Sequence, residues 1–256
     1  MRIVTGAYLI YLALPIALLV VGSFGAAWTN TLLPTGFTTG WYVEVATDPS
    51  FRRAFETSLV VVLATCLINA LIGVPLAYAI HSAARTGIRT AARIVSLMPI
   101  AVPELVLAFG FILVFSSDTL PFLGASWLLV AGHVVLTLPY LLNVLLADMA
   151  TLGLEDLERV AATLGAPFRR RLVDIVLPGL RHSLLSGLIT VAAISIGEFQ
   201  LSNLVAGFLN RTYPIVLLQA FYGATGFACA ATVILLVLAV LASAGGALTA
   251  RAARGA

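Results

Sequence analysis

The chain has 256 residues, of which 61% are hydrophobic and only 10% are charged, and its formal net charge at pH 7 is +3. Soluble domains are about 45–50% apolar and about 25% charged, so this composition excludes an ordinary soluble protein and predicts an integral membrane protein. All 14 basic residues are arginine, because the sequence contains no lysine. A phosphate-binding loop of the Walker type needs a lysine, so we expect no ATP hydrolysis by this chain.

Six apolar stretches predict an all-α membrane protein with six transmembrane helices. A helix needs about 20 apolar residues to cross the hydrocarbon core of a bilayer. The first stretch could also be a signal peptide, but its length and the weak cleavage site after it favour a retained helix. The predicted spans are residues 7–27, 57–80, 94–115, 127–148, 183–206 and 227–249.

The arginines between these spans predict the orientation of the chain in the membrane. Eleven of them fall at the N-terminus, in the loops 81–93 and 149–182, and in the C-terminal tail, all on one side of the membrane. The other side holds only Arg52, Arg53 and Arg211. Because cytoplasmic loops are enriched in Lys and Arg, both termini are expected in the cytoplasm. The arginines form no patch interleaved with aromatic residues, so no nucleic-acid partner is expected.

Two extracytoplasmic segments are too short or too polar to span the membrane. Residues 28–54 are expected to form a loop with a short interfacial helix around Ser50–Phe55. Residues 207–226 are expected to form a helix that lies in the outer interface or re-enters it.

Residues 149–182 form the one long predicted cytoplasmic loop, and they are expected to be helical. Leu154, Leu157, Ala161 and Leu164 recur at the spacing of one helix face, which predicts a stripe available for packing. A pair of amphipathic helices could simply lie on the membrane surface, with its arginines reaching the headgroups.

A break in the middle of this loop predicts an elbow between two helices. Glu155 and Arg159 are spaced as an ion pair four residues apart on the first helix. Gly165 stands where that helix would need a left-handed cap, and Pro167 where the second helix would begin. Pro178 is expected to end the second helix before the fifth span.

The same loop resembles the signature loop of the binding-protein-dependent ABC importer permeases of type I. Gly165-Ala166 is followed by Ile175 to Pro178, whose last residue lies thirteen positions after Gly165. The segments "WYVEVATDPSFRRAFETSLVVVLAT", "GVPLAYAI" and "SLMPIAVPELVLAFG" are also similar to this family, so the resemblance covers roughly residues 40–250. It is nearest to the branch that handles polyamines, ferric iron or aminoalkylphosphonates. This sequence departs from the Glu-Ala-Ala triplet of the family. Arg159 stands at the first position of the triplet, and either Glu155 or Glu158 could replace the missing glutamate.

The resemblance implies that the chain is the membrane half of a transporter and that separate ATPase subunits bind ATP and Mg²⁺. The elbow would sit in a groove of the ATPase, and the residues implied there are Glu158, Arg159, Ala161, Ala162, Leu164, Gly165, Ala166, Phe168, Leu177 and Pro178. Further implied partners are a second permease subunit, identical or different, an extracytoplasmic solute-binding protein and membrane lipid. The implied domains are 1–52 (first span and outer loop), 53–249 (the permease domain) and 250–256 (tail), in a bacterial inner membrane. No catalytic residue, metal site or cofactor is expected in this chain.

Polar residues inside the spans are candidates for the translocation pathway, because burying an ionisable group in lipid costs about 3 kcal/mol. These candidates are Asn69, Glu104, Glu198 and Asn203, with Glu104 expected near mid-bilayer. The glutamates could instead be protonated and structural, and His133, Asn143 and Gln200 are more typical of hydrogen bonds between helices. Two acidic and no basic groups in the spans favour a cationic or zwitterionic solute. As an alternative function, Glu104 and Glu198 could couple protons to transport in a secondary carrier.

Overall fold

The computed structural model describes residues 2–28, 31, 33–83 and 85–254, with side chains described between residues 4 and 240. Within these residues the secondary structure is helical, apart from two isolated β-bridges. Four helices are long and apolar enough to cross a membrane, and a bent helix pair adds a fifth candidate. The all-α membrane architecture predicted from the sequence is thus confirmed. The chain divides into two compact units, residues 1–57 with 211–245, and residues 58–210 with 246–256.

The first unit contains α1 (Arg2–Ser23), α2 (Gly40–Thr47), the start of α3 (Pro49–His81), α11 (Tyr213–Phe221) and most of α12 (Thr225–Arg254). No residue in the most apolar part of α1 is buried within the protein, as suits a helix that faces lipid.

Aromatic rings form the core of this unit. The ring of Phe51 packs edge-on against Tyr213 and Phe227, with centroids 5.3 and 5.0 Å away. The hydroxyl of Tyr213 donates a hydrogen bond to the carbonyl of Ala231 (2.8 Å), and burial raises the pKa of Tyr213 to about 12. This side chain therefore remains neutral at physiological pH.

The prediction of a separate interfacial helix around Ser50–Phe55 was wrong, because these residues form the first turns of α3. Asp48 caps that helix: its Oδ1 accepts hydrogen bonds from the backbone N–H groups of Ser50 and Phe51 at 2.8 and 3.0 Å. Pro49 follows at the first helical position, where its missing N–H costs nothing. The short helix of the segment 28–54 is α2 instead.

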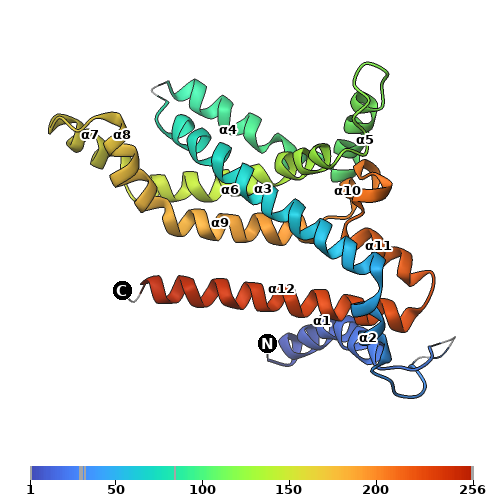
Figure 1. The fold of residues 1–256 in the computed structure, drawn as a ribbon. Coiled ribbons are helices and arrows are strands. Elements are labelled where there is room, and N and C mark those ends of the chain that lie inside the picture. Colours follow the sequence, from blue (N-terminus) through green and yellow to red (C-terminus); the bar gives the residue numbers. More distant parts are fainter. Residues whose placement is uncertain (1, 29–30, 32, 84, 255–256) are drawn as a thin grey trace. The chain divides into compact units, whose positions relative to one another are not determined.

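The second unit is built around α6 (Ser126–Thr151) and α9 (Leu177–Gly197), which lie side by side (Figure 1). α4 (Thr86–Ala101) packs on α6, and α10 (Gln200–Val205) packs on α5 (Glu104–Phe115). A side chain at Gly187 would place its Cβ 2.5 Å from Leu141 Cδ1, so this glycine permits the close approach of α6 and α9. The fully buried Leu141, Leu145 and Val191 fill the contact.

The third predicted span, 94–115, is not one straight helix. α4 ends at Ala101 and α5 begins at Glu104, and the two helices are inclined by 96°. Val102 is extended (φ −89°, ψ 126°) because the ring of Pro103 disfavours the helical conformation in the preceding residue. Glu104 therefore lies at a helix start beside this break, and its depth near mid-bilayer stays a prediction.

The fifth predicted span, 183–206, also breaks. α9 ends at Gly197, Glu198 is extended, and α10 begins two residues later. At the other end, the expected stop at Pro178 is absent, because a continuous helix runs over Phe168–Gly197. Between α8 (Phe168–Arg171) and α9 the helix widens into the π-helical turn η1 (Leu172–Val176), where Leu177 N–H bonds to the carbonyl of Leu172. The wider turn gives the ring of Pro178 room that an α-helix would deny it.

Candidate functional site

The elbow predicted around Gly165 is present. α7 (Leu154–Thr163) is followed by a residue in the left-handed conformation, Gly165, with φ of 84°. The N–H groups of Gly165 and Ala166 donate to the carbonyls of Ala162 and Ala161, each at 3.0 Å. These two bonds form the Schellman cap that a glycine at this position favours, and the cap turns the chain into α8.

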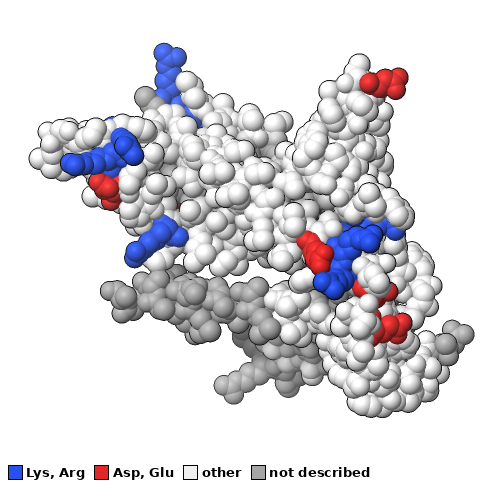
Figure 2. All heavy atoms as spheres, in the orientation of Figure 1, with Lys and Arg blue, Asp and Glu red and all other residues white. Residues whose placement is uncertain are grey.

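The outer surface of the elbow is unusually apolar for an exposed turn. The side chain of Leu164 is 83% exposed and that of Phe168 is 53% exposed, and Leu157 and Val160 are exposed as well. In Figure 2, arginine and carboxylate side chains gather over the same end of the second unit. The single packing stripe predicted for α7 is therefore divided: Leu154 is buried in the core, whereas Leu157 and Leu164 point outward.

Glu158 holds the elbow to the end of α3. It is only 7% exposed, and its Oε2 accepts a hydrogen bond of 2.8 Å from the hydroxyl of Tyr78. The guanidinium of Arg171 lies 3.8 Å from the same oxygen. The ring of Phe168 contacts the ring of Tyr78 (centroids 5.8 Å apart) and lies beneath Arg171. We call Tyr78, Glu158, Phe168 and Arg171 the elbow joint.

Two members of this joint were not predicted from the sequence. Tyr78 lies in an apolar span, inside the segment "GVPLAYAI" that resembles the family but gives this residue no role, and Arg171 is one of three consecutive arginines. Glu155 turns outward, where it forms the predicted pair with Arg159 (3.1 Å), so Glu158 is the glutamate that makes the internal contact. Asp156 also pairs with Arg159, at 3.2 Å. Leu177 and Pro178 lie within the continuous helix beyond the joint rather than at its end.

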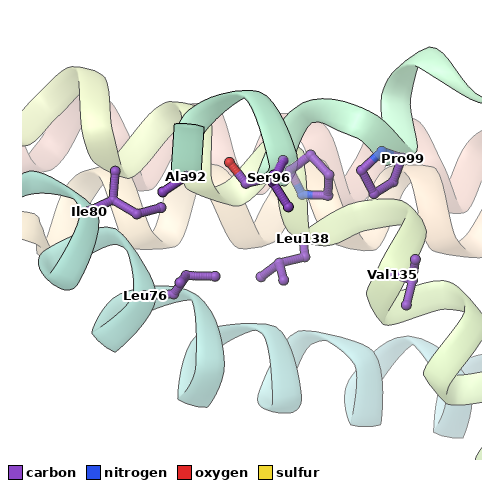
Figure 3. A pocket seen from close by; sticks show the side chains of 9 residues that line it. Leu76, Ile80, Ala92, Ser96, Pro99, Val135 and Leu138 are labelled. Atoms are coloured by element: carbon purple, nitrogen blue, oxygen red, sulfur yellow. The ribbon is translucent and has the colours of Figure 1, made fainter. Parts of the chain in front are cut away.

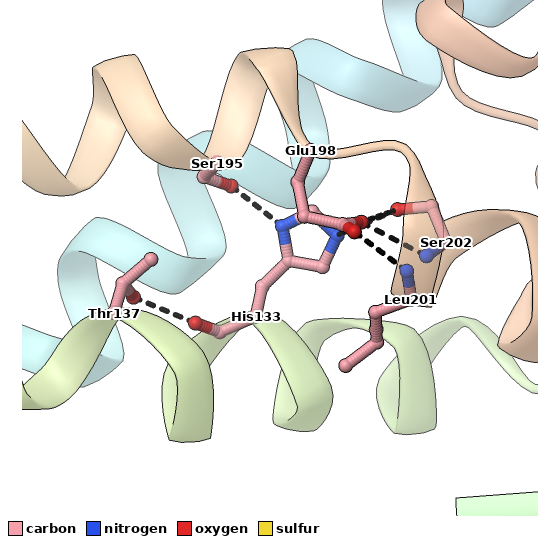
Figure 4. A network of polar contacts seen from close by, with 6 residues as sticks. All are labelled: His133, Thr137, Ser195, Glu198, Leu201 and Ser202. Carbon is pink, nitrogen blue, oxygen red and sulfur yellow. Dashed lines mark hydrogen bonds and ion pairs between the residues drawn. The ribbon is translucent and has the colours of Figure 1, made fainter. Parts of the chain in front are cut away.

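A second cluster, which we call the buried polar network, lies between α6, α9 and α10 (Figure 4). The ring nitrogens of His133 lie 2.7 Å from Ser195 Oγ and 2.9 Å from Ser202 Oγ. Glu198 accepts hydrogen bonds from the backbone N–H groups of Leu201 (2.6 Å) and Ser202 (2.8 Å) and from the Ser202 hydroxyl. The carboxylate of Glu198 thus holds the first turn of α10 in place across the helix break.

The network continues to α3 through Thr137. Asn69 Nδ2 donates to Thr137 Oγ1 (2.7 Å), whose hydroxyl donates to the carbonyl of His133 (2.6 Å). Asn69 is fully buried, and its Oδ1 has no hydrogen-bond partner among the described residues.

The four predicted pathway residues therefore occupy three different settings. Asn69 and Glu198 belong to one buried network, Asn203 is exposed on α10, and Glu104 is partly buried at the start of α5. Two oxygens of Glu198 are already occupied by donors from its own chain.

Two pockets border α4 at its contact with α6. The apolar pocket measures 330 Å³ and is shown in Figure 3; it is lined by Leu76, Ile80, Ala92, Val95, Ser96, Pro99, Val135, Leu138 and Pro139. The polar pocket measures 290 Å³ and is lined by Arg93, Ser96, Leu97, Asn143, Leu146 and Ala147. Ser96 borders both. No group of three His, Cys, Asp or Glu residues that could hold a metal ion occurs in the part of the chain that the structure describes.

Comparison with known proteins identifies the architecture. The model of the binding-protein-dependent transport system inner membrane component matches residues 70–254. The chain belongs to this family. It is an ABC importer permease subunit and a multi-pass membrane protein, and it is not itself an enzyme, as the sequence predicted. The match does not favour the secondary carrier considered as an alternative.

Relatives and solved structures agree with this assignment. The permease is 28% identical to the putative 2-aminoethylphosphonate transport system permease protein PhnV of Salmonella typhimurium, covering 75% of this chain and 71% of the relative. It is 30% identical to the molybdate/tungstate transport system permease protein WtpB of Thermococcus kodakarensis, over 70% of each chain.

Its fold is similar to that of a chain in a bacterial ABC transporter for the import of alginate, with a TM-score of 0.76 at 16% identity and coverage of 97% and 92% of the two chains. A second structure of the alginate transporter, in complex with a periplasmic protein that holds an alginate pentasaccharide, matches with a TM-score of 0.74.

Proposed function

We propose that this permease forms half of the translocation pathway of an ATP-driven importer and that its elbow receives movement from separate ATPase subunits. The arginine distribution supports an elbow and both termini in the cytoplasm, where ATP is available. ATP and Mg²⁺ would be bound by the ATPase, because this chain lacks the lysine of a phosphate-binding loop.

The observation that carries this proposal is the form of the elbow: an exposed apolar tip on a fixed base. Leu164 and Phe168 can enter a groove of a partner, and the small residues Ala161, Ala162 and Ala166 allow its backbone to approach. The base is fixed by the bond between Glu158 and Tyr78. An apolar tip that can bind a partner, on a base bonded to α3, can transmit force to the membrane helices. A helix pair that only lies on the membrane surface lacks this connection.

The continuous helix from Phe168 to Gly197 supplies the path for this movement. Its 30 residues extend over about 45 Å, so displacement of the elbow is carried deep into the membrane without an intervening loop. We infer alternating access in which ATP-driven closure of the ATPase pair moves the elbows and turns the bundle outward. The solute shifts this equilibrium only by its differential affinity for the two states.

The proposed partners follow from the same assignment. A six-span permease would pair with an identical or sister subunit, and a soluble protein outside the membrane would deliver the solute. One structure of the alginate transporter that shares this fold is a complex with a periplasmic protein, which supports delivery of the solute by a soluble protein.

For the solute, we propose a small zwitterion with a phosphonate group, such as an aminoalkylphosphonate. Two relatives are named for the transport of 2-aminoethylphosphonate and of molybdate and tungstate, and each of these solutes contains a tetrahedral oxyanion. The partly buried Glu104 is the acidic group available for an amine, whereas Glu198 is occupied by its own chain. A polyamine without an oxyanion fits these observations less well.

Gly165 provides the test of the elbow, with Gly153 as its matched control. Both glycines have positive φ, 84° and 60°, and a Cβ at either position meets no other atom of the chain within 4 Å. Asparagine tolerates this backbone conformation, so neither Gly165→Asn nor Gly153→Asn should prevent insertion. We expect Gly165→Asn to lower ATP-dependent uptake at least about tenfold, the effect of losing about 1.4 kcal/mol of contact with the ATPase. Gly153→Asn should retain uptake.

The measurement is solute uptake into cells or proteoliposomes at matched permease levels, together with co-purification of the ATPase. Wild-type uptake by Gly165→Asn would remove the support for elbow coupling. Equal losses in both variants would show that backbone strain, and not the approach of a partner, explains the effect.

A further inference from the structure

We propose that the polar pocket between α4 and α6 binds a tetrahedral oxyanion through Arg93 and Asn143. Arg93 and Ser96 reach this pocket from α4, and Asn143 reaches it from α6. The inference deepens the proposed import function, since it assigns a binding site for the anionic end of the solute.

Arg93 is available for such a ligand. Its guanidinium makes no ion pair and no hydrogen bond within the described ranges, unlike Arg52, Arg159 and Arg171, which all have acidic partners. The guanidinium offers five N–H donors in a planar fork that matches the oxygens of a phosphonate or phosphate. Its backbone carbonyl accepts a hydrogen bond from Ser96 Oγ (3.0 Å).

Asn143 adds neutral donors on the opposite wall of the pocket. Its side chain is exposed and makes no hydrogen bond to the rest of the described chain, so both N–H groups of its amide are free. Leu146 and Ala147 close the same wall with apolar surface. A charged fork on one helix and an amide on the next are sufficient to fix the orientation of one oxyanion.

The pocket lies at the end of the second unit that the sequence predicts to be cytoplasmic. Arg93 is the last residue of the predicted loop 81–93, and Asn143 is eight residues from the end of α6, or roughly 12 Å along the helix. A polar side chain inside a membrane helix faces a cavity or another helix. Arg93 and Asn143 line the same pocket, which suits a cavity that water and anions can enter.

The neighbouring apolar pocket suits the rest of a small phosphonate. It shares Ser96 with the polar pocket, and Figure 3 shows Ser96 and Pro99 above Leu138 and Val135 along α6. Along α6 the apolar residues come first, and Asn143 follows one turn closer to the elbow end. A solute that moves toward the elbow side would therefore pass the apolar pocket before its oxyanion reaches Arg93.

A tetrahedral oxyanion could come from a transported solute or from the phosphate of a lipid headgroup. The two sources share the chemistry that Arg93 recognises. They differ in whether a soluble compound can occupy the site when no phospholipid is present.

The experiment measures equilibrium binding to the full-length permease purified in maltoside detergent, which contains no phosphate. The probes are radiolabelled 2-aminoethylphosphonate, molybdate, and phosphatidylglycerol added in a separate arm. The variants are Arg93→Gln, Arg93→Lys and Asn143→Leu. The matched control is Arg85→Gln, which removes the same charge from the start of the same helix outside the pocket. Thermal melting confirms that each variant is folded.

We expect saturable binding of at least one probe, weakened about tenfold to a hundredfold by Arg93→Gln, as for loss of hydrogen bonds to a charged group. Arg93→Lys should retain part of the affinity, and Arg85→Gln all of it. Arg93-dependent binding of a soluble probe identifies the solute as the source, and Arg93-dependent retention of phosphatidylglycerol alone identifies the headgroup. No saturable binding, or equal binding by wild type and Arg93→Gln, would overturn the inference.

Failure of the proposed function is distinguishable from failure of this site. Binding is measured without an ATPase, whereas import requires one. A wild-type transporter that shows no ATP-dependent uptake would refute the proposed function even where Arg93 binds an oxyanion.

Discussion

The elbow joint leads to a quantitative prediction about Tyr78 and Glu158. Tyr78→Phe removes one hydroxyl and leaves the ring that packs on Phe168. Glu158→Ala removes the acceptor of the 2.8 Å hydrogen bond and the anion that faces Arg171. If the joint fixes the elbow, the effects of the two substitutions on the free energy of unfolding should not be additive.

The size of the effect follows from the geometry. A hydrogen bond to a charged group contributes about 1.5–3 kcal/mol, and the partial exposure of Tyr78 favours the lower end of that range. We expect Tyr78→Phe to lower the free energy of unfolding by about 1.5 kcal/mol and Glu158→Ala by about 2–3 kcal/mol. The double variant should lose about 1–1.5 kcal/mol less than the sum, because the shared bond is lost only once. Glu155→Ala, on the exposed face of the same helix, should cost under about 0.5 kcal/mol.

The assay is a double-mutant cycle, with unfolding of the purified permease in mixed micelles as the first readout. The second readout is the ratio of solute imported to ATP hydrolysed by the assembled transporter, which a purely structural role would leave unchanged. Additive losses in the double variant, or equal losses from Glu155→Ala and Glu158→Ala, would refute the joint.

Two further predictions concern the buried polar network and the orientation of the chain. Glu198→Gln should remain folded with a lower melting temperature. Glu198→Leu leaves the buried N–H groups of Leu201 and Ser202 unpaired, at about 1–3 kcal/mol each, and should fail to fold. Similar melting of both variants would contradict this account. A cysteine at Ala166, in a chain carrying Cys66→Ala and Cys229→Ala, should react with a membrane-impermeant maleimide only after the cells are opened, and labelling of intact cells would reverse the proposed topology.

Local signals in the sequence were sufficient for much of the fold. The apolar runs located the spanning helices, since length and hydropathy determine what can cross a bilayer. The Gly165 cap was predictable because only glycine readily adopts the left-handed turn that ends α7. The bend after Ala101 had a visible cause in Pro103, but a proline does not reveal whether a helix kinks slightly or turns by 96°.

Contacts between distant segments were not predictable in the same way. Tyr78 and Glu158 are 80 residues apart, and His133 and Ser195 are 62 residues apart, so neither pair produces a periodic pattern in the sequence. Glu198 looked like a group exposed to a solute because its helix was expected to continue. Once the helix stops at Gly197, the same carboxylate has backbone donors within reach and becomes part of the interior.

The π-helical turn Leu172–Val176 determines how α8 is rotated about the helix axis relative to the membrane part of the long helix. A π turn behaves as an α-helix that has gained one residue, and each residue of an α-helix accounts for about 100° of rotation. If these five positions closed into a regular α-helix, α8 would turn by about 100° relative to the membrane part of the long helix, and a different side of α8 would face a docked partner. The side of α8 that a partner meets therefore depends on the form of this turn as well as on the residues of α8.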